Sequence, residues 1–137
     1  MPIKVMIVDD SASVREGLAI SLEEFPDLDL VAEASNGAEA IRLCETLQPD
    51  VVLMDLAMPG IDGVATTRAI RASLPDTRVV VLTGLREKSM IQSALQAGAI
   101  GYLLKTVSVS ALVNTIHAVY ENPGSAGMAR ERVESPL

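Results

Sequence analysis

Short apolar runs alternate with amphipathic segments along most of the chain. Five runs rich in Val, Ile and Leu predict buried strands, at residues 3–8, 28–34, 50–54, 78–82 and 100–104. The segments after them repeat apolar residues at helical spacing, which predicts helices at residues 14–25, 38–47, 64–74, 87–97 and 112–120. Serines precede the first and the last of these helices as candidate N-caps, namely Ser11 or Ser13 and Ser108 or Ser110.

Five strand–helix units in strict alternation predict an α/β protein with a parallel sheet that helices cover on both faces. For five strands in a doubly wound sheet we expect the flavodoxin-like order 2-1-3-4-5, which is an inference from the fold class and not from periodicity. Residues 123–137 differ in composition, with Gly, Ser and Pro near their two ends, and are predicted to form a linker or tail.

Composition narrows the function classes. The 137 residues fit one domain, and 49% of them are apolar, which is enough for a buried core. A net charge of −7 repels phosphate backbones, so we expect no direct binding of nucleic acid by this chain. The lone Cys44 excludes an internal disulfide and a thiolate metal cluster. No apolar run is long enough to cross a membrane and no signal peptide precedes the first strand, which predicts a cytoplasmic location.

Polar side chains directly follow four of the predicted strands. Asp9 and Asp10 follow the first strand, Asp55 the third, Thr83 the fourth and Lys105 the fifth. The carboxyl ends of parallel strands share one edge of the sheet, where the ligands of open α/β sheets bind. The sequence therefore predicts a single site with three carboxylates, a hydroxyl group and an ammonium group.

These groups suit phosphoryl chemistry. Two carboxylates at about 5 Å repel each other by roughly 3 kcal/mol at an effective dielectric constant of about 20, and a divalent cation removes this penalty. An all-oxygen ligand set selects a hard ion, Mg²⁺ or Mn²⁺. Lys105 and Thr83 would bind phosphoryl oxygens, and Asp55, which stands alone on its strand, would be the nucleophile of an acyl phosphate. We expect the loop shaped by Met58-Pro59-Gly60 to leave this carboxylate accessible.

Each of these residues also has a purely structural interpretation. The negative charges of Asp9 and Asp10 could simply stabilise the start of the following helix by interacting with its dipole, and Asp55 could belong to a turn. Thr83 could cap a strand end, and Lys105 could be a solvated surface charge. All of these interpretations would have to hold together at four strand ends of one sheet edge, which favours a shared site.

Four motifs carry a resemblance to a known family. They are Val8-Asp9-Asp10, the run Asp55-Leu56-Ala57-Met58-Pro59-Gly60-Ile61-Asp62-Gly63, Leu82-Thr83-Gly84 and Gly101-Tyr102-Leu103-Leu104-Lys105. With them, residues 3 to about 121 resemble the receiver domain of bacterial two-component response regulators. The last two motifs resemble the subgroup that precedes a LuxR/NarL-type helix-turn-helix domain. The resemblance implies a receiver domain over residues 1–122, followed by the linker or tail at 123–137.

The resemblance also implies a phosphoacceptor and a set of metal ligands. Asp55 would take a phosphoryl group from a phosphohistidine on a sensor histidine kinase. Asp9, Asp10, Asp55 and the backbone carbonyl of Ala57 would hold Mg²⁺.

A switch is implied as well. Lys105 and Thr83 would bind the phosphoryl oxygens, with Thr83 moving toward them. Tyr102 would swing inward, although the residues alone leave open whether it packs or moves. The face of the fourth helix, the fifth strand and the fifth helix would be remodelled. The resemblance implies a regulator of transcription and not an enzyme. The chain would form a homodimer when phosphorylated and act on DNA through a C-terminal helix-turn-helix domain outside these 137 residues, without contact with a membrane.

Two alternatives stay open at this point. One is an Mg²⁺-dependent phosphatase with an aspartyl nucleophile, which steady turnover of phosphate esters would support. Those enzymes usually carry Asp-x-Asp after the first strand, whereas this chain has Asp9-Asp10-Ser11 there. The same position lacks the Gly-x-Gly-x-x-Gly motif of a nucleotide-binding unit, which makes that class weaker still. The other is an interaction module that dimerises without phosphorylation, which an oligomeric mass insensitive to a phosphoryl mimic would support.

Overall fold

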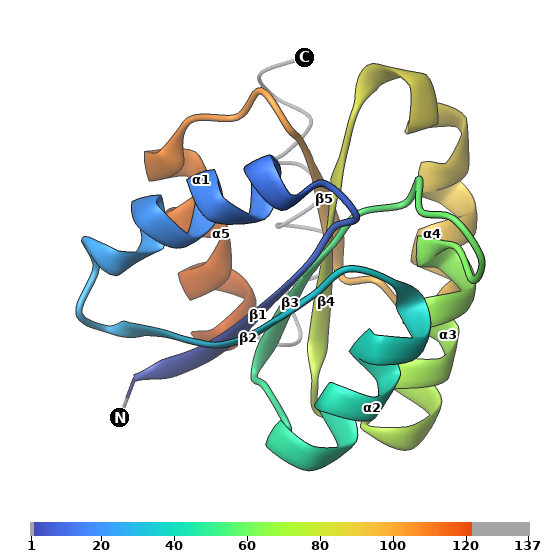
Figure 1. The fold of residues 1–137 in the computed structure, drawn as a ribbon, viewed down its shortest axis with the longest axis horizontal. Coiled ribbons are helices and arrows are strands. Elements are labelled where there is room, and N and C mark those ends of the chain that lie inside the picture. The colour runs from blue at the N-terminus through green and yellow to red at the C-terminus, as the bar shows by residue number, and fades with distance from the viewer. Residues whose placement is uncertain (1, 122–137) are drawn as a thin grey trace.

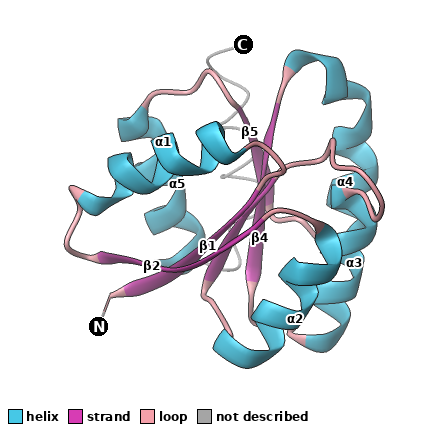
Figure 2. Cartoon of the chain, viewed as in Figure 1, coloured by secondary structure: helices cyan, strands magenta, loops and turns pink. Residues whose placement is uncertain are grey.

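A five-stranded parallel sheet forms the centre of the computed structural model, which describes residues 2–121 apart from the side chains of Leu85 and Arg86. The sheet order is β2-β1-β3-β4-β5, which confirms the predicted doubly wound topology. Figure 2 shows the strands of the sheet in magenta, with the helices around them in cyan. The predicted linker or tail at 123–137 lies outside the described residues. The strands are β1 (Ile3–Val8), β2 (Leu28–Ala34), β3 (Val51–Met54), β4 (Arg78–Thr83) and β5 (Gly101–Leu104).

Helices cover both faces of the sheet, as the alternation predicts. Figure 1 shows α1 and α5 on one face and α2, α3 and α4 on the other. Within the described part of the chain, no helix is long and apolar enough to cross a membrane. The elements are α1 (Ala12–Glu23), α2 (Gly37–Leu47), α3 (Gly63–Ser73), the 3₁₀ helix η1 (Leu85–Met90), α4 (Ile91–Ala97) and α5 (Val109–Glu121).

The central strands are continuous apolar runs because both faces of the sheet are covered. All four residues of β3 are at most 1% exposed. In the strand register, Met54 at the end of β3 lies beside Val8 at the end of β1 and beside Val81 in β4. The ends of β1 and β3 are therefore level, and the residues that follow them emerge side by side.

Serine side chains fix the starts of the first and last helices. The Ser11 hydroxyl accepts a hydrogen bond from the Val14 N–H group (3.4 Å), and the Ser108 hydroxyl accepts one from the Ala111 N–H group (3.1 Å). Each satisfies one of the backbone donors that a helix start leaves unpaired. The first serine of each predicted pair is thus the cap.

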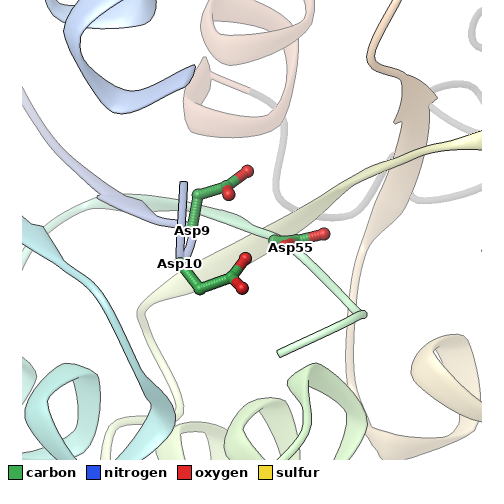
Figure 3. A group of neighbouring side chains, drawn as sticks. All are labelled: Asp9, Asp10 and Asp55. Atoms are coloured by element: carbon green, nitrogen blue, oxygen red, sulfur yellow. The ribbon is translucent and has the colours of Figure 1, made fainter. Parts of the chain in front are cut away.

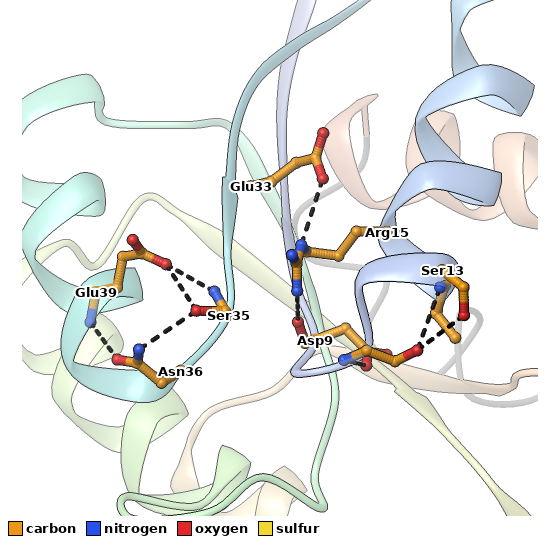
Figure 4. Close-up of polar contacts among 9 residues, drawn as sticks. Asp9, Ser13, Arg15, Glu33, Ser35, Asn36 and Glu39 are labelled. Atoms are coloured by element: carbon orange, nitrogen blue, oxygen red, sulfur yellow. Dashed lines mark hydrogen bonds and ion pairs between the residues drawn. The ribbon is translucent and has the colours of Figure 1, made fainter.

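A reciprocal set of hydrogen bonds starts α2. The Asn36 side chain accepts from the Glu39 N–H group (2.9 Å), and the Glu39 carboxylate accepts from the Ser35 N–H group (2.7 Å; Figure 4). This arrangement resembles a capping box and ties the end of β2 to the first turn of α2.

The connection from β4 to α4 differs from the prediction. A helix was expected over residues 87–97, but the chain first forms η1 and only then the seven-residue α4. Neither Gly84 nor Met90, at the two starts, provides a side-chain cap. Without such an acceptor the first turn tightens to i→i+3 hydrogen bonds, for example from the Glu87 N–H group to the Gly84 carbonyl (3.3 Å).

The first turn of α3 lies against the backbone that leads into it. Asp62 caps the helix by accepting from the Ala65 N–H group (2.9 Å), and the Gly63 N–H group donates to the Leu56 carbonyl (3.1 Å). A Cβ atom at Gly63 would overlap the carbonyl oxygen of Asp55 and lie 2.6 Å from the Leu56 Cα atom. Glycine is therefore required for this close approach.

Replacing Gly63 with alanine tests the contact. We expect Gly63→Ala to lower the free energy of unfolding by about 1–3 kcal/mol, because the added methyl group overpacks the start of α3. Urea unfolding measures the change. Gly17→Ala is the matched control: Gly17 lies in α1 with nothing within 4 Å of an added Cβ. That substitution should raise stability by about 0.5–1 kcal/mol. Equal stability of Gly63→Ala and the wild type would contradict the packing argument.

Candidate functional site

Backbone hydrogen bonds bring the ends of four strands together. The Asp55 N–H group donates to the Val8 carbonyl (2.9 Å), and the Lys105 N–H group donates to the Thr83 carbonyl (2.8 Å). These bonds extend the ladders of β1–β3 and β4–β5 by one residue. The side chains that follow the apolar runs are thereby fixed at one edge of the sheet, as predicted.

Three carboxylates gather at this edge. Asp9, Asp10 and Asp55 each offer one oxygen, and these oxygens lie within 4.8 Å of one another (Figure 3). Asp9 and Asp55 are each 2% exposed, whereas Asp10 faces solvent. An all-oxygen set with one open side fits a hard divalent cation that keeps part of its water shell. The residues present therefore fit Mg²⁺ or Mn²⁺.

Lys105 bridges the two buried carboxylates. Its Nζ atom lies 3.1 Å from Asp9 Oδ2 and 3.1 Å from Asp55 Oδ1. Burial without a partner would be costly for either carboxylate, and a shared ammonium group offsets that cost only in part. Among the described residues, Lys105 is the one cation that pairs with these carboxylates, so one positive charge contacts a group of three negative ones.

Burial and the neighbouring charges together set the pKa values of Asp55 and Lys105. Burial, and next the negative charge of Asp9, raise the pKa of Asp55 above its ordinary value; hydrogen bonding and the charge of Lys105, with the Ala57 N–H group (3.4 Å), counteract part of the rise. Burial tends to lower the pKa of Lys105, but its hydrogen bonds to the two carboxylates and their charges raise it above the ordinary value. Lys105 therefore stays protonated at neutral pH.

The expected accessibility of Asp55 is wrong for this conformation. Its side chain is 2% exposed, and the ammonium group of Lys105 lies beside Oδ1. The cause lies in the loop, because Leu56 and Met58 are buried in the core (0% and 7% exposed) and draw the chain against the sheet. An incoming group has to share or displace the ammonium contact.

Thr83 and Tyr102 are both buried. The hydroxyl of Thr83 donates to the carbonyl of Gly84 (3.2 Å), so in this conformation it is engaged by its own chain segment. Tyr102 is 6% exposed and belongs to the hydrophobic core. The structure thus brings the three carboxylates and Lys105 together, while a phosphoryl-binding role of Thr83 and a movement of Tyr102 stay predictions.

Three residues make contacts with Asp9 or its neighbours that the sequence did not predict, and one of them, Ser11, was predicted only as a helix cap. The Ser11 N–H group donates to Asp9 Oδ1 (2.9 Å), and the Arg15 Nη1 atom donates to the Asp9 backbone carbonyl (2.6 Å). Arg15 also pairs through Nε with Glu33 Oε1 (3.4 Å; Figure 4). One sequence signal was present: a cation near the start of a helix opposes the helix dipole, which makes Arg15 unusual there.

Comparison with known proteins identifies the family. The model of the response regulator receiver domain matches residues 5–117. The transcriptional regulatory protein LiaR of Bacillus subtilis is 42% identical over 116 residues, which are 85% of this chain and 55% of LiaR. The response regulator UvrY of Escherichia coli is 42% identical over 118 residues, 86% of this chain and 54% of UvrY. The chain spans about half the length of these curated relatives.

Solved structures of receiver domains support the same family. The signal receiver domain of the response regulator NarL from Mycobacterium tuberculosis superposes with a TM-score of 0.81 at 35% identity, covering 88% of this chain and 97% of that domain. A two-component response regulator of the LuxR family from Aurantimonas gives 0.82 at 36% identity, covering 89% and 87% of the two chains. The chain therefore belongs to the response regulator receiver domain family of two-component systems, with relatives of the NarL/LuxR type.

Proposed function

We propose that Asp55 accepts a phosphoryl group from a phosphohistidine of a sensor histidine kinase. Asp9, Asp10, Asp55 and the backbone carbonyl of Ala57 would hold the Mg²⁺ or Mn²⁺ ion that the reaction requires. The observation that supports this proposal is the contact of Lys105 with both buried carboxylates at 3.1 Å, next to a third carboxylate within 4.8 Å.

The charges of the described site support a dependence on the cation. One ammonium group cannot neutralise three carboxylates. After burial, the negative charge of Asp9 is the next cause that raises the pKa of Asp55. When bound, a divalent ion would neutralise carboxylate charge and pair with phosphoryl oxygens. Asp10, which faces solvent, leaves an open side for its entry.

The chain's own groups account for the transfer step. A carboxylate oxygen of Asp55 attacks phosphorus, so an O–P bond forms while the N–P bond of phosphohistidine breaks; its electron pair stays on the imidazole nitrogen, which takes a proton from solvent. Lys105, already beside Oδ1, stabilises the charge of the transferred group. The product is an acyl phosphate, and its hydrolysis to phosphate restores Asp55.

The output of the switch completes the proposal. Phosphorylation would draw the Thr83 hydroxyl from Gly84 to the phosphoryl group, move Tyr102 and remodel the face of α4, β5 and α5. The chain would act as a regulator, not as an enzyme, in the cytoplasm. It would dimerise when phosphorylated and control transcription through a C-terminal helix-turn-helix domain. The support is that curated relatives about twice as long are transcriptional regulators.

Labelling by acetyl phosphate tests the phosphoacceptor. In the presence of Mg²⁺ the wild type should gain the mass of one phosphoryl group, and Asp55→Asn should lose at least nine tenths of the labelling, because an amide is a poor nucleophile. Intact-mass spectrometry measures both. Asp50→Asn, at the opposite end of β3, is the matched control and should be labelled normally, since its amide oxygen still accepts from the Lys4 N–H group. Undiminished labelling of Asp55→Asn would refute the assignment.

The raised pKa of Asp55 predicts a pH-dependent stability difference. Below its ordinary pKa of about 3.9, Asp55 is protonated in both states and costs nothing; the folded state loses stability as pH rises through the raised pKa. Without divalent cations, Asp55→Asn should therefore melt higher than the wild type at neutral pH, by about 4 °C for each kcal/mol of relief. The difference should shrink toward pH 4. Thermal unfolding monitored by circular dichroism gives both values, and a lower melting temperature of the variant at neutral pH would contradict the argument.

A further inference from the structure

Arg15 connects the acidic site to two other elements. It lies in the first turns of α1, and its Nη1 atom donates to the backbone carbonyl of Asp9 at 2.6 Å. Its Nε atom pairs with Glu33 on β2 at 3.4 Å (Figure 4). The Arg15 side chain is 19% exposed, so most of it is packed against the protein.

The carbonyl that Arg15 binds determines the direction of the next residue. The peptide unit between Asp9 and Asp10 is planar, so fixing the oxygen of Asp9 also fixes the Cα atom of Asp10. Asp10 is exposed, so its backbone orients its carboxylate more than side-chain packing does. A change at Arg15 therefore acts on Asp10 through the peptide plane.

The same segment is held from its other sides. The Asp9 N–H group donates to the Ala34 carbonyl (3.0 Å), and Asp9 Oδ1 accepts from the Ser11 N–H group (2.9 Å). Glu33 lies beside Ile7 in the register of β1 and β2, which places its carboxylate one step before the strand ends. Arg15 is thus the one described side chain that hydrogen-bonds the carbonyl between the two candidate ligands.

We propose that Arg15, oriented by Glu33, is a positioning residue for divalent cation binding by Asp9 and Asp10. This inference rests on the proposed function, since it assumes that the carboxylates hold a cation. Groups that orient metal ligands without touching the metal commonly set its affinity. Arg15 acts through the Asp9–Asp10 peptide and not through its charge.

Charge alone gives the opposite expectation. Arg15 is a cation near an acidic site, so removing it should strengthen the binding of Mg²⁺ by lowering electrostatic repulsion. Removing an orienting hydrogen bond should weaken that binding. The sign of the change in Mg²⁺ affinity therefore separates the two explanations.

The test is Mg²⁺ binding by the isolated chain without phosphorylation. Calorimetric titration and the Mg²⁺-dependent rise in melting temperature both report the dissociation constant. Arg15→Met should raise that constant about tenfold, the lower end of the effect of residues behind metal ligands. Glu33→Gln, which keeps an acceptor but loses the ion pair, should raise it about threefold.

Two further variants isolate the geometry. The double variant, Arg15→Met with Glu33→Gln, has the wild-type net charge. It should bind Mg²⁺ no more weakly than Arg15→Met alone, because the two substitutions act through the same contact. Arg15→Lys keeps the charge and one donor and should recover part of the affinity. With acetyl phosphate, labelling of Arg15→Met should return to the wild-type rate at saturating Mg²⁺.

Arg78→Met is the matched control. Arg78 is also half-buried and donates from Nη1 to a backbone carbonyl, that of Asp76 (3.0 Å), but at the opposite end of the sheet. Its loss should leave the dissociation constant for Mg²⁺ unchanged. Equal or tighter binding by Arg15→Met would overturn the positioning role, as would a lower melting temperature with an unchanged dissociation constant. A wild type that neither binds Mg²⁺ nor becomes labelled would instead overturn the proposed function.

Discussion

The contact of one ammonium group with two buried carboxylates is the interaction on which the site depends. Lys105 lies 3.1 Å from both Asp9 and Asp55, and each carboxylate is almost fully removed from water. An ion network selected for stability alone would match its charges or be replaced by apolar side chains of similar volume. Here Asp10 adds a third negative charge to the same edge. Uncompensated charge of this kind concentrates at functional sites, where a ligand supplies the missing counter-charge.

The fold creates this contact by keeping parallel strands in register. A slip of one residue between β1 and β3 would turn every side chain of one strand to the other face. The hydrogen bonds from the Asp55 N–H group to Val8 and from the Lys105 N–H group to Thr83 extend the ladders by one residue and so fix the backbone of these two site residues. The packing of Gly63 against the Asp55 backbone then determines where the chain leaves the sheet. The same backbone contacts therefore stabilise the central strands and set the geometry of the site.

The sequence predicted the gathering of Asp9, Asp10, Asp55 and Lys105, because an apolar run ending on a polar residue marks both a buried strand and its exit. The strand order, by contrast, was inferred from the fold class, and the structure confirms it. Periodicity carries no information about what covers a side chain, so the burial of Asp55 by its loop was missed.

Local signals failed elsewhere for physical reasons as well. The 3₁₀ start of the segment before α4 depends on missing caps, whereas apolar spacing is nearly the same for both helix types. The pair of Arg15 and Glu33 joins residues from two elements, and only the three-dimensional arrangement brings them together.

The two halves of the site are held to different degrees. On the side of β1 and β3, the Ser11 N–H group, Arg15 and the close packing of Gly63 fix the carboxylates through backbone contacts. On the side of β4, η1 begins at Gly84 without a side-chain cap, and among the described residues the Thr83 hydroxyl bonds to the neighbouring carbonyl of Gly84. A charge added at Asp55 would therefore meet carboxylates held by backbone contacts on one side and, on the other, a segment whose start has no side-chain cap. If Asp55 is phosphorylated as proposed, we expect the conformational response to run from Thr83 into η1 and α4, because fewer contacts have to be broken there.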